Sequence, residues 1–180
     1  MIRDTRQLHQ AAPEPTVLVA GVGNVFLGDD GFGVEVARRL AAEDLPPGVK
    51  VADFGIRGVH LAYELCDGYE LAILVDAVPR GEEPGTLYVI EPEPPGDPDP
   101  DDAPPLDAHG MDPGAVLSLL GILGGHVDRV LVVGCEPAVA DERMGLSAPV
   151  AAAVDPAVTL VQELINEHHV PSPDGRREEA

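Results

Sequence analysis

Short apolar runs alternate with helical patterns along most of the chain, and this alternation restricts the fold more than any other feature of the sequence. The segment 17–20 (VLVA) is continuously apolar and ends at Gly21, as expected for a strand that is buried on both faces. Apolar residues then repeat at helical spacing from Gly33 to Ala41. Strands that alternate with helices predict a mostly parallel sheet with helices on both faces. The expected fold is therefore α/β, a three-layer α/β/α sandwich around a mostly parallel, twisted sheet.

The same pattern continues towards the C-terminus. We expect a helix at 59–65 and strands at 49–54, 71–75, 85–92 and 130–133. The direction of the strand at 85–92 stays open, because the connection before it is short. The stripe of apolar residues from 150 to 165 is the clearest helix in the sequence, and Pro156 inside it predicts a kink or a division into two pieces.

The length of 180 residues predicts one domain, with the α/β unit at 16–167. Segments 1–15 and 168–180 are expected to be flexible ends. Segment 91–107 holds seven prolines and seven carboxylates with no basic residue, so we expect a mobile acidic loop there.

The formal charge of −21, from 11 basic and 32 acidic residues, would repel nucleic acid and favours a cation or a basic polypeptide as partner. The sequence has no long uncharged apolar run and no apolar segment near Met1, so we expect no membrane span, no secretory signal and a cytoplasmic protein. Cys66 and Cys135 are too few for a disulfide framework and are expected to be small buried side chains. The oligomeric state stays undefined.

The segment GVGNVFLGDDGFG (21–33) raises the alternative of a dinucleotide-binding domain. Its glycines at 21 and 23 fit the nucleotide fingerprint, but Phe26 stands where the third glycine is expected. Asp53 follows the second predicted strand, roughly where a ribose-binding acid would lie. Asp29 and Asp30, however, would repel a phosphate at the start of the following helix. One of these two aspartates is expected to cap that helix, which leaves the other unexplained.

Acidic residues follow two of the predicted parallel strands. Asp29 and Asp30 come after the strand at 17–20, and Asp76 comes directly after the strand at 71–75. Ligands of such sheets bind outside the carboxyl ends of the strands, so these side chains are candidates for one shared site. Carboxylates there favour a positively charged ligand over a phosphate.

Five motifs together resemble the hydrogenase maturation endopeptidases, which trim the C-terminal extension from the nickel-loaded large subunit of nickel–iron hydrogenases. In chain order they are GVGNVFLGDDGFGVEVARRL, DFGIRGVHLAYEL, LAILVDAVPRGEEPGTL, DAHGMD and VVGCEPA. The resemblance implies that Asp30, Asp76 and His109 are both the metal ligands and the catalytic residues. It also implies that the ion is Ni²⁺ presented by the substrate, with another divalent ion as an alternative at the same site, and that the partner is a hydrogenase large-subunit precursor.

The chemistry of the three residues is compatible with this role, because two carboxylates and one imidazole can hold a divalent ion and leave positions open for a substrate. Hydrolysis could then follow one of two routes, a metal-polarised carbonyl or a water activated by a carboxylate. A second class of function is a nickel-binding escort that holds the precursor without cleaving it. The dinucleotide-binding domain is the third.

Overall fold

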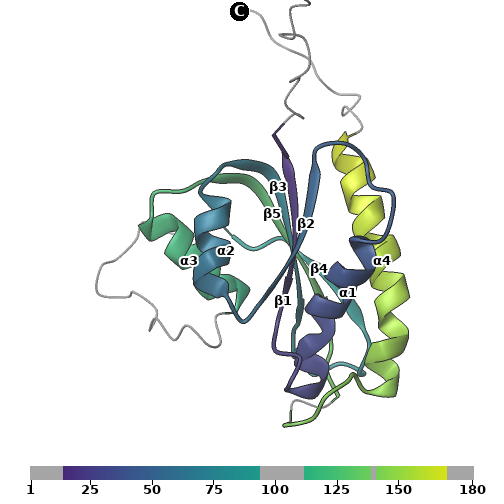
Figure 1. The fold of residues 1–180 in the computed structure, drawn as a ribbon. Coiled ribbons are helices and arrows are strands. Elements are labelled where there is room, and N and C mark those ends of the chain that lie inside the picture. Colours follow the sequence, from purple (N-terminus) through teal and green to yellow (C-terminus); the bar gives the residue numbers. More distant parts are fainter. Residues whose placement is uncertain (1–13, 94–111, 139–140, 170–180) are drawn as a thin grey trace, which may run out of the picture.

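The computed structural model describes residues 14–93, 112–138 and 141–169. In these residues five strands form one sheet in the order β2-β1-β3-β5-β4 (Figure 1). The strands are β1 (Val17–Val22), β2 (Val49–Gly55), β3 (Tyr69–Ala77), β4 (Leu87–Ile90) and β5 (Val127–Cys135). All neighbouring pairs are parallel except β4 and β5, which are antiparallel. The antiparallel edge settles the direction that the sequence left open.

Helices cover both faces of the sheet, as Figure 1 shows. Val17 and Val19 of β1 belong to the core cluster that contains α1 (Phe32–Leu40) and α4 (Ala148–His169). The alternate residues Leu18 and Ala20 belong to a second cluster, with α2 (Gly58–Leu65) and α3 (Pro113–Ile122). Because successive side chains of a strand point to opposite faces, β1 is buried on both sides. The predicted three-layer α/β/α sandwich is confirmed.

The chain changes direction across the sheet between β1 and β3. It runs from β1 through α1 to β2 on one side, and then through α2 to β3 on the other side of β1. The loops that leave the carboxyl ends of β1 and β3 therefore lead in opposite directions, and we call the space outside these two strand ends the crevice. This is the place where a sheet of this type binds its ligand.

The first turn of α1 packs directly on these two strands. A Cβ atom at Gly33 would lie 1.9 Å from the carbonyl oxygen of Val75 and 2.4 Å from that of Val22. Only glycine allows the helix backbone to come so close to the ends of β1 and β3. The short 3-10 helix η1 (Gly28–Gly31), which precedes α1 and carries the two aspartates, is thereby fixed beside the crevice.

Helix α3 is not among the helices that we predict from the sequence, although its N-terminus has a clear signal. The Asp112 carboxylate accepts a hydrogen bond of 2.9 Å from the N–H of Ala115, and Pro113 is the first helical residue. An aspartate cap followed by proline is a strong N-terminal signal. The residues after it are almost all apolar, so they lack the amphipathic stripe by which the other helices were found.

The predicted division of the last helix at Pro156 is wrong, because α4 is continuous from Ala148 to His169. Pro156 cannot donate to the carbonyl of Ala152, but both residues are exposed and water can satisfy that oxygen. By length and composition α4 could also span a membrane. In this fold its apolar stripe is buried against α1 and the sheet, so we assign it to the core.

The structure describes only a few residues of the predicted flexible ends and of the predicted acidic loop. Residues 14–15 and 91–93 are described, and α4 extends through the first two residues of the predicted tail. The rest of the predicted flexible ends and of the acidic loop lies outside the described residues. Cys135 is buried as expected, but Cys66 at the end of α2 is exposed, which corrects that prediction.

Candidate active site

Asp30 lies in η1, and the preceding loop closes over it. The Asp30 carboxylate accepts a hydrogen bond of 2.7 Å from the backbone N–H of Asn24. Gly23 has a φ of +125°, and a Cβ atom there would lie 1.8 Å from the Asp30 carbonyl oxygen. The loop can follow this path only with glycine at position 23. Asp30 itself stays partly exposed, so its carboxylate remains available to a ligand.

Asp76 lies near the end of β3 and is only 7% exposed. Its Oδ1 atom accepts a hydrogen bond of 2.8 Å from the N–H of Ala77. Burial, with the nearby charges of Asp30 and Asp112, raises the pKa of the Asp76 carboxyl from 3.8 to about 7. A carboxyl group with such a pKa can hold or release a proton near neutral pH.

The two aspartates meet at the crevice between β1 and β3. A Cβ atom at Gly23 would overlap the Asp30 carbonyl and would lie 3.6 Å from Oδ1 of Asp76, which is ordinary contact, so position 23 adjoins both aspartates. Asp30 is also close enough for its charge to raise the pKa of Asp76, so the two aspartates are neighbours, while their predicted role as one ligand site stays a prediction. Two acidic groups in one crevice attract a cation, and one of them is already poised to exchange protons.

His109 lies outside the described residues, so its predicted place beside the aspartates stays a prediction. Within the described ranges, no group of three His, Cys, Asp or Glu side chains could hold a metal ion. Asp112, three residues further along the sequence, is close enough for its charge to raise the pKa of Asp76. The chain therefore returns to the neighbourhood of the aspartates just after His109.

Asp29 differs from its neighbour because it is completely buried. Its Oδ1 atom accepts a hydrogen bond of 2.6 Å from the N–H of Ser147. Its Oδ2 atom accepts bonds of 2.8 Å from the N–H of Ala138 and 2.9 Å from the hydroxyl of Ser147. Neither η1 nor α1 has a side-chain cap, so the predicted capping role of an aspartate is wrong. Asp29 instead ties η1 to the connection between β5 and α4.

Glu136 is a second buried carboxylate that the sequence did not single out. It accepts hydrogen bonds from the hydroxyl of Tyr88 at 2.7 Å and from the N–H groups of Arg80 and Gly81 at 2.7 and 3.2 Å. These bonds, with the Tyr88 hydroxyl first, lower the pKa of Glu136. Glu136 therefore fixes the loop that follows Asp76. Glu136 directly follows β5 in the structure, but the strand predicted from the sequence ends three residues earlier, at 133.

Other polar residues have partners of their own away from the aspartates. Asp53, the candidate ribose-binding acid, forms an ion pair of 3.7 Å with Arg38. His168 lies 3.4 Å from a carboxylate oxygen of Glu70. His126 is paired with Asp128 at 3.2 Å.

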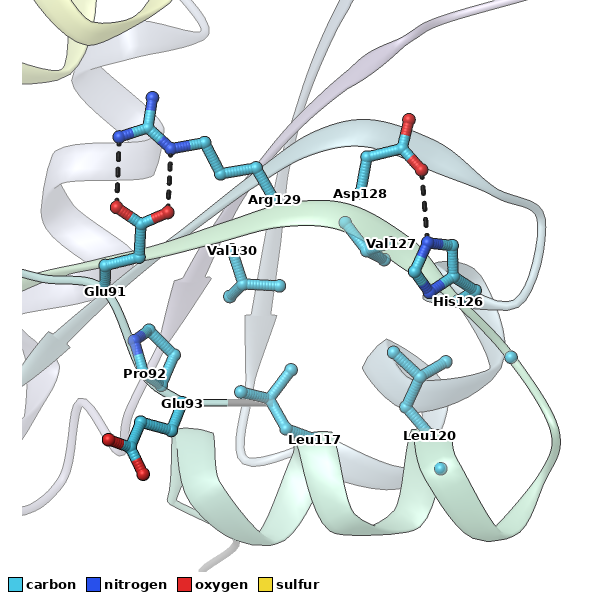
Figure 2. A pocket seen from close by; sticks show the side chains of 12 residues that line it. Glu91, Pro92, Glu93, Leu117, Leu120, His126, Val127, Asp128, Arg129 and Val130 are labelled. Carbon is cyan, nitrogen blue, oxygen red and sulfur yellow. Dashed lines mark hydrogen bonds and ion pairs between the residues drawn. The ribbon is translucent and has the colours of Figure 1, made fainter. Parts of the chain in front are cut away.

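A pocket of about 420 Å³ lies between α3 and the first half of β5 (Figure 2). Leu117, Leu120 and Val130 form part of its apolar lining, and an ion pair of 2.9 Å between Glu91 and Arg129 closes one side. In the sheet Val127 pairs with Tyr69 at the start of β3, whereas Asp76 pairs with Gly134 near the end of β5. The pocket is thus separated from the aspartates by most of the length of the sheet.

Residues 34–164 match the model of the hydrogenase maturation protease family, HycI, over most of the chain. The chain belongs to this family. A dinucleotide-binding domain, the third sequence-based alternative, is not supported by this match.

Relatives of the hydrogenase maturation protease family share both sequence and fold with the chain. The crystal structure of a hydrogenase 2 maturation peptidase from a Thaumarchaeota archaeon is 36% identical, with a TM-score of 0.65, and the match covers 83% of this chain and 97% of that one. The hydrogenase maturating endopeptidase HybD of Escherichia coli is 28% identical, with a TM-score of 0.69 and coverage of 85% and 93%. The hydrogenase expression/formation protein HupD of Rhizobium leguminosarum is 31% identical over 155 residues, which are 81% of this chain and 72% of HupD.

Proposed function

We propose that this chain is a metal-directed endopeptidase that removes the C-terminal extension from the nickel-loaded large-subunit precursor of a nickel–iron hydrogenase. The observation that carries the proposal is the convergence of Asp30 and Asp76 at the crevice between β1 and β3. Membership of the hydrogenase maturation protease family supports the reaction class. The nickel belongs to the substrate in this proposal, so the protease would recognise a precursor whose metal is already in place.

Asp30, Asp76 and His109 are the proposed ligands of that nickel. Carboxylate oxygens and a neutral imidazole form a donor set that suits a divalent transition metal. Three protein ligands would leave coordination positions for groups of the precursor itself. The raised pKa of Asp76 supports the same assignment, because a bound cation would stabilise the carboxylate that burial and Asp30 now destabilise.

Asp76 also has the proton affinity that a general base needs near neutral pH. In one route its carboxylate removes a proton from the attacking water. In the other route both aspartates only hold the precursor, and the nickel of the substrate polarises the scissile carbonyl group. Both routes require the two side chains to stay in the crevice, so the same variants test them.

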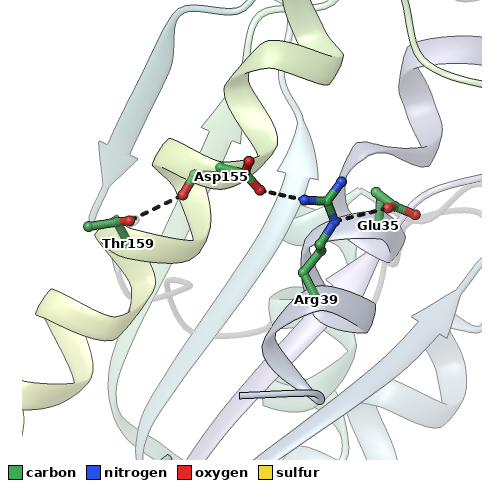
Figure 3. Close-up of polar contacts among 4 residues, drawn as sticks. All are labelled: Glu35, Arg39, Asp155 and Thr159. Carbon is green, nitrogen blue, oxygen red and sulfur yellow. Dashed lines mark hydrogen bonds and ion pairs between the residues drawn. The ribbon is translucent and has the colours of Figure 1, made fainter. Parts of the chain in front are cut away.

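The test is incubation of the purified chain with a nickel-loaded precursor, followed by mass spectrometry of the precursor. The wild-type chain is expected to release the C-terminal extension, and Asp30→Ala, Asp76→Ala and His109→Ala to leave it attached. Asp155→Ala is the matched control, because Asp155 is an exposed carboxylate of α4 whose partner is Arg39 (Figure 3). Normal cleavage by all three site variants would overturn the proposed ligand set.

The same experiment addresses the alternative of a nickel-binding escort. An escort would bind the nickel-loaded precursor stably and release no peptide, even after long incubation. Precursor without nickel is the second control, since a metal-directed enzyme should leave it intact. Cleavage that does not depend on nickel would contradict the metal-directed mechanism but not the protease activity.

A further inference from the structure

Three loops at the carboxyl edge of the sheet expose large apolar side chains. Phe26, in the loop after β1, is 63% exposed, although the other two phenylalanines of the chain are buried. Ile56 follows β2 and is 38% exposed. Met144 lies between β5 and α4 and is 73% exposed. Single exposed apolar residues are common, but three from separate loops at one edge require an explanation.

Backbone contacts join these loops to one another and to the aspartates. Leu27 and Arg143 form an isolated parallel bridge, and the Gly28 N–H donates to the Arg143 carbonyl at 2.8 Å. Phe26 and Met144 therefore flank one bridge. On the other side, the Gly23 N–H donates to the carbonyl of Gly55, directly before Ile56, at 3.0 Å. The loop that carries Phe26 is the same one whose Asn24 holds Asp30. We call the three side chains the apolar rim.

The backbone beneath the apolar rim is fixed by hydrogen bonds. The Phe26 N–H donates to the side-chain oxygen of Asn24 at 3.0 Å, and the Leu27 N–H donates to the Asn24 carbonyl at 3.0 Å. After β2, the Arg57 guanidinium donates to the carbonyl of Phe54 at 3.1 Å. A surface whose backbone is already ordered loses little conformational entropy when a partner binds to it. Aromatic residues and methionine are also enriched where protein interfaces are fully buried.

We propose that Phe26, Ile56 and Met144 form the docking surface for an apolar segment of the precursor, next to the peptide bond that is cleaved. The inference rests on the proposed function, because an endopeptidase must hold its polypeptide beside the reacting groups. The apolar rim is continuous with the loop that surrounds Asp30, so a chain bound there would reach the crevice. Three other exposed apolar residues lie on α2 or at the end of α3: Tyr63, Ile122 and Leu123. Val89 lies on the edge strand β4, where it pairs with Val133 of β5, so β5 and β3 separate it from the loop after β1.

The experiment measures cleavage and binding of the nickel-loaded precursor by Phe26→Ala, Met144→Ala and the double variant. Each single change is expected to raise KM about tenfold and the double change about a hundredfold, as for anchors of an interface, with kcat within about twofold of wild type. Phe26→Leu should recover most of the loss. Ile122→Ala is the matched control, since Ile122 is 47% exposed but lies at the far end of α3, and its KM should equal that of wild type.

Dissociation constants of the immobilised precursor separate this inference from the proposed function. If wild type releases the extension and the variants keep its KM and its dissociation constant, the apolar rim is not the docking surface, while the protease function stands. If wild type binds but releases nothing, the protease function fails, and weaker binding by the variants still supports the docking surface. A wild-type chain that neither cleaves nor binds the precursor overturns both. Thermal unfolding of each variant checks that the fold is intact.

Discussion

Replacement of Asp29 by asparagine tests whether Asp29 stabilises the fold, in contrast to the neighbouring Asp30, for which we propose a role in the reaction. Both oxygens of the buried Asp29 carboxylate accept hydrogen bonds, one from the N–H of Ser147 and the other from the N–H of Ala138 and the Ser147 hydroxyl. An asparagine side chain has only one acceptor oxygen. In either orientation its NH₂ group faces a backbone N–H for which the described residues provide no other acceptor. The serine hydroxyl can rotate, but the backbone groups cannot.

The expected loss follows from these contacts. A hydrogen bond to a charged acceptor contributes about 1.5–3 kcal/mol, and a buried donor left unpaired costs about 1–3 kcal/mol. Asp29→Asn loses the charge and leaves one backbone N–H unpaired, so the free energy of unfolding should fall by about 3 kcal/mol. A domain with a total of about 5–15 kcal/mol stays folded after such a loss. For a chain of this size the melting temperature should fall by about 6–12 °C.

Urea unfolding followed by circular dichroism at pH 8 measures this difference. Ser147→Ala removes only the hydroxyl bond to Asp29 and should cost about 1 kcal/mol. Asp30→Asn is the matched partner variant: it keeps an acceptor for the Asn24 N–H, removes a charge next to Asp76 and should cost no stability while cleavage is lost. An Asp29→Asn variant as stable as wild type, or an equal loss in Asp30→Asn, would refute this assignment of roles.

Three further predictions concern the same region. The folded pKa of Asp76, about 7, lies above its ordinary 3.8, so the native state binds the extra proton and its stability falls as pH rises between these values. Asp76→Asn without metal should therefore raise the free energy of unfolding by up to about 4 kcal/mol at pH 8 and by almost nothing at pH 4, as measured by urea titration at both pH values. In the same assay Gly33→Ala should lower the free energy of unfolding by about 3 kcal/mol or more, because the added Cβ atom would clash with the Val75 carbonyl. Gly81→Ala is the control: its Cβ atom would have no neighbour within 4 Å, so only the positive φ should matter, at a cost of about 1 kcal/mol. The pKa of Glu136 is lowered, so its contribution to stability is present above its ordinary pKa and is lost on acidification; Glu136→Gln should flatten the acid limb of a thermal-stability profile.

The position of the acidic pair could be predicted because it depends on a general property of parallel sheets. Asp30 and Asp76 follow strands that a simple apolar pattern identifies, and the carboxyl ends of such strands share one edge. The role of Gly33 was also open to prediction in outline, since a glycine at the start of a helix on a sheet often permits close packing. The structure identifies the atoms that a side chain at position 33 would clash with, the carbonyl oxygens of Val75 and Val22.

The buried carboxylates could not be interpreted from the sequence in the same way. Asp29 binds Ser147, which is 118 positions away, and Glu136 binds Arg80, which is 56 positions away. Local patterns carry no information about such partners, so a helix cap was the nearest available explanation for Asp29. The division predicted at Pro156 is wrong for a related reason: whether a proline ends a helix depends on the surroundings of the carbonyl group that it leaves unpaired, and here that carbonyl belongs to the exposed Ala152.

Because the chain changes direction between β1 and β3, the acidic pair and the apolar rim are carried largely by different loops. Asp30 follows β1 and Asp76 lies near the end of β3, and the backbone of α1 packs against the ends of both strands. Ile56 and Met144 sit on connections that begin at other strands. If the apolar rim binds the precursor as proposed, exchanging the β2–α2 connection for that of a relative would change recognition without altering the support of the acidic pair, whereas an exchanged β5–α4 connection would have to keep Ala138 and Ser147, which hold Asp29.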